Sequence, residues 1–236
     1  MIEKEAFEQL LTSISIQPQP DDYWLFSRYC ALLQEWNQKM NLTAITDDQG
    51  IAIKHFIDSL LPLTLWPLPQ NARLIDIGAG AGFPSVPIKL IRKDLHLTLL
   101  DSQEKRLVFL RHLCSNLGID ATTLHFRAED AGRNPNHREK YTIATSRAVA
   151  PLPALVEYSL PLVAPGGLML ALKGSTGQEE ALSATHAIAL CGGKLEQVIS
   201  YQLPTGDPRT LVVIKKISQS PTKYPRSSAQ IAKRAL

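Results

Sequence analysis

The spacing of hydrophobic positions changes near residue 70, and this change divides the chain into parts. Before it, apolar side chains recur every three or four residues, which is typical of amphipathic helices. The clearest run consists of Tyr23, Phe26, Cys30 and Leu33. A second run extends from Ile51 to Leu61 and should end at Pro62, because proline lacks the N–H that a helix interior needs. We expect residues 1–70 to form a helical cap.

Beyond residue 70, short apolar segments alternate with helical patterns. The apolar segments are residues 72–77, 96–100, 121–126, 141–145, 168–172, 195–201 and 210–217. Alternation of strands and helices predicts a mostly parallel sheet covered on both faces. The last two segments are joined without a helix, so they should form an antiparallel edge pair. We therefore predict an α/β, Rossmann-like fold with a seven-stranded sheet over residues 71–218.

Two later segments complete the outline. A helix is predicted over 151–163, with a break at Pro165-Gly166-Gly167 before the fifth strand. Residues 219–236 follow as a basic C-terminal tail. The cations from residue 210 onward, where the chain has no acid, are Lys215, Lys216, Lys223, Arg226, Lys233 and Arg234. Such a tail could bind phosphate groups, or it could be an unstructured, solvated end.

The stretch Ala-Arg-Leu-Ile-Asp-Ile-Gly-Ala-Gly-Ala-Gly-Phe, residues 72–83, is the strongest motif in the chain. A buried strand reaches the acid Asp76, and glycines follow at Gly78, Gly80 and Gly82. Prolines shortly afterwards suit the first turn of a helix. A strand that passes through a glycine-rich turn into a helix can cradle a nucleotide, because glycine lets the backbone approach the ligand. The alternative is a merely tight strand-to-helix turn.

The spacing of the glycines decides which nucleotide is favoured. The dinucleotide fingerprint has a glycine at its sixth position, where this chain has Phe83, and no GK[ST] sequence follows to wrap phosphates. An acid followed by G-x-G-x-G instead resembles the cofactor loop of Rossmann-like methyltransferases that use S-adenosylmethionine (SAM). SAM carries a cationic sulfonium and no phosphate, so an acid beside the loop is reasonable.

Other candidate residues stand at the ends of the predicted strands, where open α/β sheets bind ligands. Asp101 ends the second strand, 19 positions after Gly82, and its carboxylate could bind ribose hydroxyls or cap the next helix. The third strand leads into residues 127–130, which could meet an adenine edge or form a solvated turn. Arg147 ends the fourth strand and Lys173 the fifth, so both cations lie on the same rim.

Composition narrows the class of protein. The chain has 236 residues, of which 44% are hydrophobic, which supports a sizeable core. It contains no apolar run of membrane-spanning length, and its start lacks the layout of a signal peptide. The three distant cysteines should be buried thiols, and the histidines show no metal-ligand spacing. We expect a soluble cytoplasmic protein without a metal. The net charge of +3 does not by itself indicate nucleic acid.

Motifs along nearly the whole chain resemble the bacterial RsmG family, also called glucose-inhibited division protein B. The matching motifs are Trp36-Asn37, residues 40–43, 54–59, 76–84, 100–102, 105–106, 109–110, 127–129, 146–148 and 224–226. This family methylates guanine N7 in 16S ribosomal RNA with SAM as the methyl donor. Two departures are Ser85, where the family commonly has glycine, and residues 227–230, where it commonly has lysine, proline and glycine.

The resemblance implies roles for individual residues. The SAM contacts it implies are Gly78, Phe83, Ala128, Glu129 and Arg147, with Asp101 and Ser102 near the ribose. Guanine N7 has a free lone pair and no proton, so its methylation needs no general base. On the substrate side we expect Arg147, Lys173, Asn41 and His55, although His55 and Asp58 could simply be a pair on one helix face.

The resemblance also implies a partner, which is 16S ribosomal RNA, the small ribosomal subunit or an assembly intermediate of it. We expect the protein to act as a monomer. Two alternatives remain open at this point: a SAM-dependent methyltransferase of small molecules, and a non-catalytic SAM-binding module on the ribosome. A nicotinamide enzyme is least favoured because of Phe83.

Overall fold

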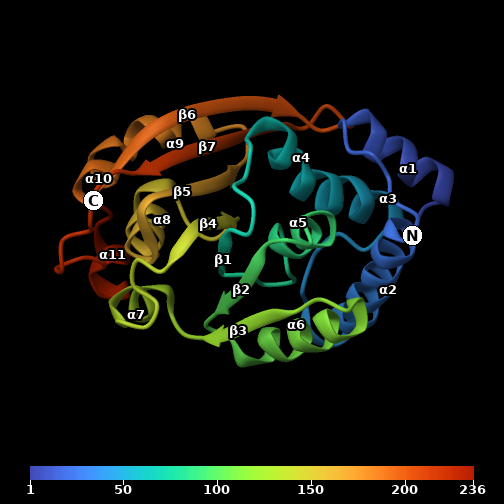
Figure 1. Ribbon diagram of the computed structural model, residues 1–236, viewed down its shortest axis with the longest axis horizontal. Helices are drawn as coiled ribbons and strands as arrows, with labels where there is room; N and C mark the ends of the chain where they lie inside the picture. Colours follow the sequence, from blue (N-terminus) through green and yellow to red (C-terminus); the bar gives the residue numbers. More distant parts are fainter.

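A seven-stranded sheet runs through the middle of the molecule, and the computed structural model describes all residues from 1 to 236 (Figure 1). The strands are β1 (Arg73–Ile77), β2 (His96–Asp101), β3 (Ala121–His125), β4 (Tyr141–Arg147), β5 (Val163–Lys173), β6 (Gly193–Gln202) and β7 (Pro208–Lys216). Their order is β3-β2-β1-β4-β5-β7-β6. Neighbours among β1 to β5 are parallel, whereas β7 is antiparallel to both β5 and β6. The predicted mostly parallel sheet with an antiparallel pair at one edge is confirmed.

Helices cover both faces of this sheet. The elements from the first third of the chain are α1 (Lys4–Ser13), α2 (Asp22–Met40), α3 (Asp48–Gly50), the π-helix η1 (Ile51–Ile57) and α4 (Asp58–Leu65). With α5 (Ser85–Ile91) and α6 (Glu104–Leu117) they lie over one face. The other face carries α7 (Ala128–Arg133), α8 (Leu152–Ser159), the 3-10 helix η2 (Leu160–Leu162), α9 (Gly177–Ser183) and α10 (Thr185–Leu190). A last helix, α11 (Ser228–Lys233), lies near the C-terminus.

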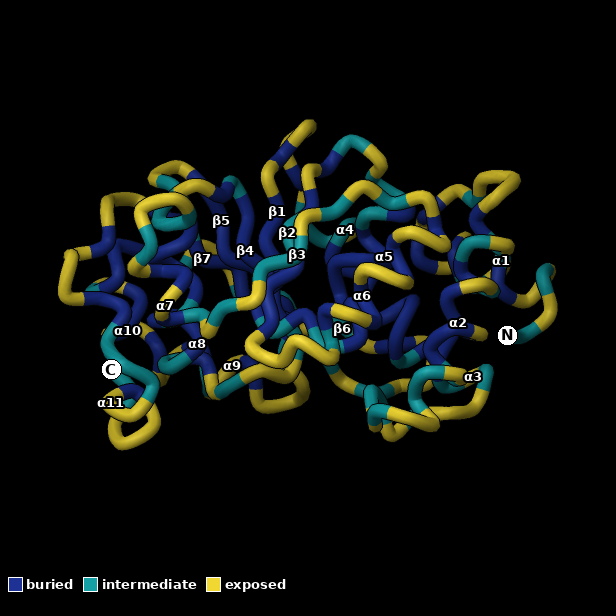
Figure 2. Tube along the Cα trace, turned by 90° about the horizontal axis from the view of Figure 1, so that it is seen from below, coloured by how far each residue is buried: buried dark blue, intermediate teal, exposed yellow.

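The N-terminal helices share one hydrophobic core with the sheet. A single cluster of 41 buried residues joins Phe7, Phe26 and Phe56 to Leu74 and Leu99, which are strand residues. In Figure 2 the buried trace accordingly continues from the sheet into α2, while the two termini lie at opposite ends of the molecule. The alternation of strand residues explains this arrangement, because every second side chain faces the helices on one side. Residues 1–70 therefore have no separate core.

Two sequence predictions about breaks are wrong. Pro62 does not end its helix but lies inside α4, which continues to Leu65. Leu60 and Leu61 are buried beside it, so packing outweighs the one hydrogen bond that proline cannot donate. Likewise, Pro165-Gly166-Gly167 is not a break before a strand, because β5 already begins at Val163.

The glycines in β5 make a β-bulge instead. The pairing with β4 shifts there, from Tyr141 opposite Val163 to Ile143 opposite Leu168. Gly166 has a φ of +88°, and a Cβ on Gly167 would lie 2.6 Å from the Thr142 carbonyl oxygen. Glycine in a strand pattern marks such close approaches of two backbones.

The C-terminal tail is folded against the body of the protein, so the second of the two alternatives considered for it, an unstructured end, is wrong. Tyr224 is buried, and Arg226 forms an ion pair of 2.7 Å with the fully buried Glu157 of α8. Ser227 and Gln230 cap α11 reciprocally. All three cysteines are buried free thiols, as predicted. None of the helices has the length and apolar character needed to cross a bilayer.

Candidate active site

A cavity of about 280 Å³ opens at the carboxyl ends of the parallel strands. It brings together six residues that the sequence nominated: Gly78, Asp101, Ser102, Ala128, Glu129 and, from the adjacent residues 127–130, Arg127. Its other walls come from Ile77, Leu100, Arg106, Phe126, Ala148, Val149 and Tyr158. The sequence did not single out Phe126, which directly follows β3, or Tyr158, which α8 brings to the cavity.

The glycine loop is fixed by backbone and carboxylate contacts. Gly78 adopts a φ of +68°, and a Cβ there would lie 2.8 Å from Val149 Cγ2, so only glycine suits this turn. The Gly80 N–H donates to Asp101 Oδ2 at 3.0 Å, and the Gln103 N–H donates to Asp101 Oδ1 at 2.8 Å. Asp101 therefore orders the loop and the start of α6 at once, and its carboxylate lies in the cavity wall.

Not every residue of the motif lines this cavity. Gly82 is a packing position, because a Cβ there would lie 2.5 Å from Tyr29 Oη. Phe83 lies behind the loop, with its ring between those of Tyr29 (5.2 Å between centroids) and His55 (4.5 Å). Tyr29 Oη donates to the Ala81 carbonyl oxygen at 2.6 Å, so a side chain of α2 fixes the backbone of the glycine loop.

Glu129 is placed by the short helix α7, which replaces the turn considered for residues 127–130. Only 5% of Glu129 is exposed, and its Oε1 accepts from Arg127 Nε at 2.9 Å. Its Oε2 accepts no hydrogen bond from the protein. A buried carboxylate with a free oxygen beside a cavity can accept from an N–H group of a ligand.

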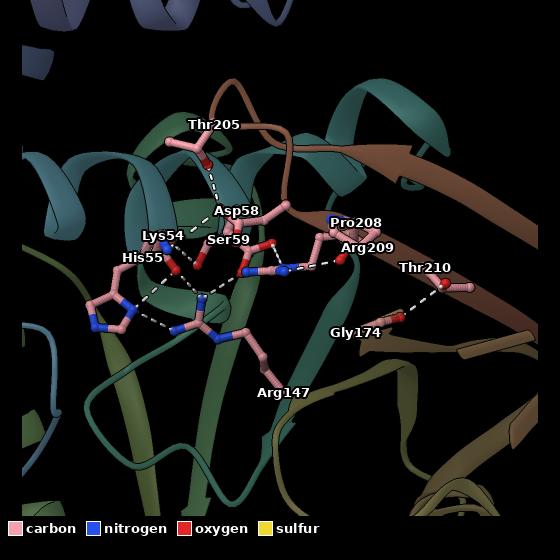
Figure 3. Close-up of polar contacts among 11 residues, drawn as sticks. Lys54, His55, Asp58, Ser59, Arg147, Gly174, Thr205, Pro208, Arg209 and Thr210 are labelled. Atoms are coloured by element: carbon pink, nitrogen blue, oxygen red, sulfur yellow. Dashed lines mark hydrogen bonds and ion pairs between the residues drawn. The ribbon is translucent and has the colours of Figure 1, made fainter. Parts of the chain in front are cut away.

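A second cavity of about 430 Å³ adjoins the first, and Figure 3 shows several of the residues that line it. Ala148 lines both, with a φ of +56° that carries the chain away from β4. The charged and polar residues of the second cavity are Lys54, His55, Asp58, Arg147, Lys173, Glu180 and Arg209. They come from η1, α4, β4, β5, α9 and β7, which no single segment of sequence could reveal.

Arg147 is bound on several sides by the N-terminal cap. Its Nη1 donates to the Lys54 carbonyl oxygen at 3.1 Å and to Asp58 Oδ2 at 3.3 Å. Its Cζ lies 4.9 Å from the centroid of the Phe83 ring. Burial lowers the pKa of Arg147 from its ordinary value, and the Asp58 carboxylate opposes that shift.

His55 contacts the same guanidinium. His55 Nδ1 lies 3.0 Å from Arg147 Nη2 and 3.2 Å from the Lys54 carbonyl oxygen. Because arginine is only a donor and makes the shorter contact, we assign Nδ1 as the unprotonated nitrogen. His55 Nε2 then donates to Thr43 Oγ1 at 2.7 Å. Burial, followed by the Arg147 charge, lowers the pKa of His55 to about 4. His55 is therefore neutral near pH 7, and its lone pair is already used.

The other two substrate-side candidates are placed differently. Lys173 lines the second cavity, but its Nζ is held by the Ala150 carbonyl oxygen and by Glu180, each at 2.7 Å. Asn41 is exposed at the end of α2, with a φ of +50°, and lines neither cavity. The structure thus brings Arg147, Lys173 and His55 together and leaves Asn41 outside.

Comparison with known proteins identifies the family. The family described as "GidB: rRNA small subunit methyltransferase G" matches residues 23–209. The chain belongs to this family. A Pelotomaculum thermopropionicum protein named ribosomal RNA small subunit methyltransferase G is 47% identical over 213 residues, which are 89% of each chain. The Lactococcus lactis strain IL1403 protein of that name is 42% identical over 97% of each chain.

Solved structures support the fold. A structural genomics target from Corynebacterium glutamicum aligns with a TM-score of 0.54 and 21% identity, covering 91% of this chain and 98% of its own. A methyltransferase from Pyrococcus furiosus aligns with a TM-score of 0.55 and 12% identity, covering 81% and 98%. At these identities the likeness concerns the architecture, which is that of Rossmann-like methyltransferases.

Small subunit methyltransferase G proteins take their methyl group from SAM, and the first cavity suits this cofactor. The side-chain-free Gly78 leaves room that a Cβ would fill. The carboxylates of Asp101 and Glu129 can accept from ribose hydroxyls and from an adenine amino group. Asp76 Oδ1, buried behind the loop, has no hydrogen-bond partner in the protein. When bound, SAM supplies an electrophilic methyl group; the chain supplies its alignment.

Asp76 also explains the departure at position 85. The Ser85 hydroxyl donates to Asp76 Oδ2 at 2.5 Å, and both residues are completely buried. Burial raises the pKa of Asp76 to about 7, although the Ser85 hydrogen bonds oppose the shift. In this family member, the Ser85 hydroxyl therefore donates a hydrogen bond to the buried Asp76 carboxyl group. A glycine at this position has no side chain and could not make that bond.

We predict that Asp76→Asn stabilises the cofactor-free protein above pH 7. The pKa of Asp76 is higher in the folded state (about 7) than its ordinary value of 3.8, so the unfolded chain loses this proton first as pH rises. The free energy of unfolding should consequently fall between about pH 4 and pH 7. The variant avoids this loss, a gain on the order of 2–4 kcal/mol at pH 8 and none at pH 4.

Urea denaturation at both pH values measures this effect. Asp120→Asn is the control, because Asp120 is exposed at the turn after α6. An Asp76→Asn variant that is no more stable than wild type at pH 8 would contradict the prediction.

Proposed function

We propose that this protein transfers the methyl group of SAM to N7 of a guanine in 16S ribosomal RNA. The observation that supports this most directly is the pair of adjoining cavities that share Ala148. The first has the carboxylates of an adenosine site, and the second is rich in cations that suit a polyanion. The relatives of this chain are named for methylation of the same RNA.

N7 is the proposed acceptor because the second cavity contains no free general base. The Nδ1 lone pair of His55 is occupied by Arg147, and the Asp58 oxygens are occupied by Arg147 and Arg209. An acceptor that must lose a proton would need such a base. Guanine N7 has an available lone pair and no proton, so alignment of base and methyl group is sufficient.

We assign the predicted residues to these two sites as part of the proposal. Gly78, Asp101, Ser102, Ala128 and Glu129 bind SAM directly. Asp76, Gly80, Gly82 and Phe83 support the loop from behind, as their contacts with Ser85, Asp101 and Tyr29 indicate. Arg147, His55 and Lys173 form the wall on the side of the substrate. Asn41, exposed outside both cavities, remains an RNA contact only in this proposal.

We also propose a role for each of the three parts of the chain. Residues 71–218 would bind the cofactor, and residues 1–70 would form the roof of the substrate cavity through η1. Residues 219–236 would be a basic C-terminal tail packed on the body of the protein. Action on ribosomal RNA implies a cytoplasmic location. The protein would act as a monomer, since both cavities are formed within one chain.

Methyl transfer to RNA tests the proposal. The protein is incubated with methyl-labelled SAM and either protein-free 16S RNA or small-subunit particles from cells that lack the enzyme. We expect label in RNA as 7-methylguanosine at one position, found by nuclease digestion and mass spectrometry. Methylation of small molecules instead, or SAM binding without any transfer, would refute it in favour of the two alternatives considered above.

A further inference from the structure

Arg209 enters the second cavity from β7, a segment to which no functional motif was assigned. The turn between β6 and β7 packs against the π-helix η1, where Lys54 Nζ lies 3.5 Å from Asp207 Oδ2 (Figure 3). One residue beyond Pro208, Arg209 reaches Asp58. The antiparallel edge pair of the sheet therefore contributes a second cation, beside Arg147, to the Asp58 carboxylate.

The hydrogen bonds of Arg209 leave one end of its guanidinium free. Nε donates to both oxygens of Asp58, at 3.1 and 3.2 Å, and Nη1 donates to the Pro208 carbonyl oxygen at 3.0 Å. Nη2 donates to no protein group. The side chain is 22% exposed, on the wall of the cavity. By contrast, both Nη atoms of Arg147 are engaged by the cap.

Asp58 is the carboxylate that orients this arginine. Its side chain is 5% exposed, and its two oxygens lie between the guanidinium groups of Arg147 and Arg209. A buried carboxylate between two cations holds each of them in one direction. Because the cation and its partner are both fixed before a ligand arrives, little conformational entropy is lost on binding.

The charges of the cavity favour an anion. Its walls carry four cations, Lys54, Arg147, Lys173 and Arg209, against the carboxylates of Asp58 and Glu180. A planar guanidinium with free N–H groups matches the oxygens of a phosphate. Phosphate contacts also fix the register of a nucleic acid without reading its sequence.

We propose that Arg209, positioned by Asp58, binds a backbone phosphate of the target RNA beside the methyl-acceptor base. The proposal deepens the function proposed above and rests on it, since it names the group that anchors the RNA strand. Arg209 is the contact with the substrate, and Asp58 is a positioning residue that acts through it.

Arg209→Gln tests the anchor, with Arg92→Gln as a matched control. The Arg92 side chain is 25% exposed and is also paired with an aspartate, Asp94. It lies at the opposite rim of the sheet, and its Nη atoms are all bound to protein oxygens. RNA affinity is measured by fluorescence anisotropy at several salt concentrations, with a labelled 16S RNA transcript and with small-subunit particles. SAM affinity is measured by calorimetry.

For Arg209→Gln we expect about tenfold weaker RNA binding and a KM for RNA raised about tenfold, with kcat changed less than twofold. The slope of log K against log[salt] should become less steep by about 0.7–0.9, which corresponds to the loss of one phosphate contact. Arg209→Lys should restore most of the salt dependence, because it restores the charge. Arg92→Gln should match wild type.

Other results would overturn the proposal. RNA affinity and salt dependence equal to those of Arg92→Gln would show that Arg209 binds no phosphate. Loss of SAM affinity or of thermal stability in both Arg209 variants would make Arg209 a structural residue. If wild type bound RNA through Arg209 but transferred no methyl group, the proposed function would fail while the anchor remained.

Discussion

Arg147→Ala is expected to lower kcat/KM for RNA methylation by about 100-fold, a loss of ~3 kcal/mol in transition-state stabilisation. The reason is that Arg147 connects the cap to the rim of the sheet through the Lys54 carbonyl oxygen, His55 and Asp58. Without it these buried acceptors lose a charged donor, at 1–3 kcal/mol for each group left unpaired. The wall between the two cavities would also lose its shape.

Steady-state kinetics and SAM calorimetry measure this loss. Arg73→Ala serves as the control, because Arg73 is exposed at the start of β1, at the other end of the sheet. Arg147→Lys should recover only a small part of the activity, since one ammonium cannot reach three acceptors in different directions. Turnover and SAM affinity that both survive in Arg147→Ala would remove Arg147 from the site.

Lys216→Met is expected to destabilise the protein by about 3–5 kcal/mol, the largest effect on folding that we predict. Lys216 is completely buried, and its Nζ donates to the Leu160 and Cys191 carbonyl oxygens at 2.8 and 3.1 Å. It also contacts the Ser220 hydroxyl and pairs with Glu139 at 3.3 Å. Methionine has a similar volume but removes the charged donor from these buried oxygens and leaves the Glu139 carboxylate without its cation.

Equilibrium unfolding in urea at pH 7 measures the difference. Burial lowers the pKa of Lys216 to about 8, so the amine is still mainly protonated at that pH. Lys194→Met is the control, because Lys194 is exposed on the edge strand and should change stability by less than about 0.5 kcal/mol. Equal unfolding midpoints for the two variants would contradict the prediction.

The sheet and the first cavity could be predicted from sequence because both depend on local patterns. Strand and helix alternate with their own periods, and the G-x-G-x-G turn at residues 78–82 requires glycine at fixed positions. The residues at strand ends follow from the parallel arrangement, so Asp101 and Glu129 were found together in the cavity wall. Periodicity alone did not place the breaks, since Pro62 continues a helix and Gly166 forms a bulge inside a strand.

The second cavity was only partly predictable, because its geometry is set by contacts between distant segments. Asp58 pairs with Arg209, 151 positions later, and nothing in either segment indicates the other. The same is true of Lys216, which in the sequence is one more cation of the acid-free stretch after residue 210 but is internal in the fold. A sequence pattern reports that a residue is charged; only the fold shows whether solvent or another chain segment is its partner.

The bond between Tyr29 and the Ala81 carbonyl has an evolutionary consequence. In many enzyme families, a recognition module can be exchanged by recombination while the catalytic unit stays intact. Here an imported module would need to supply a hydrogen-bond donor to the Ala81 carbonyl oxygen, and rings that stack on Phe83. New specificity in this lineage should therefore arise by point substitution on the cavity walls, and hardly ever by exchange of the amino-terminal helices.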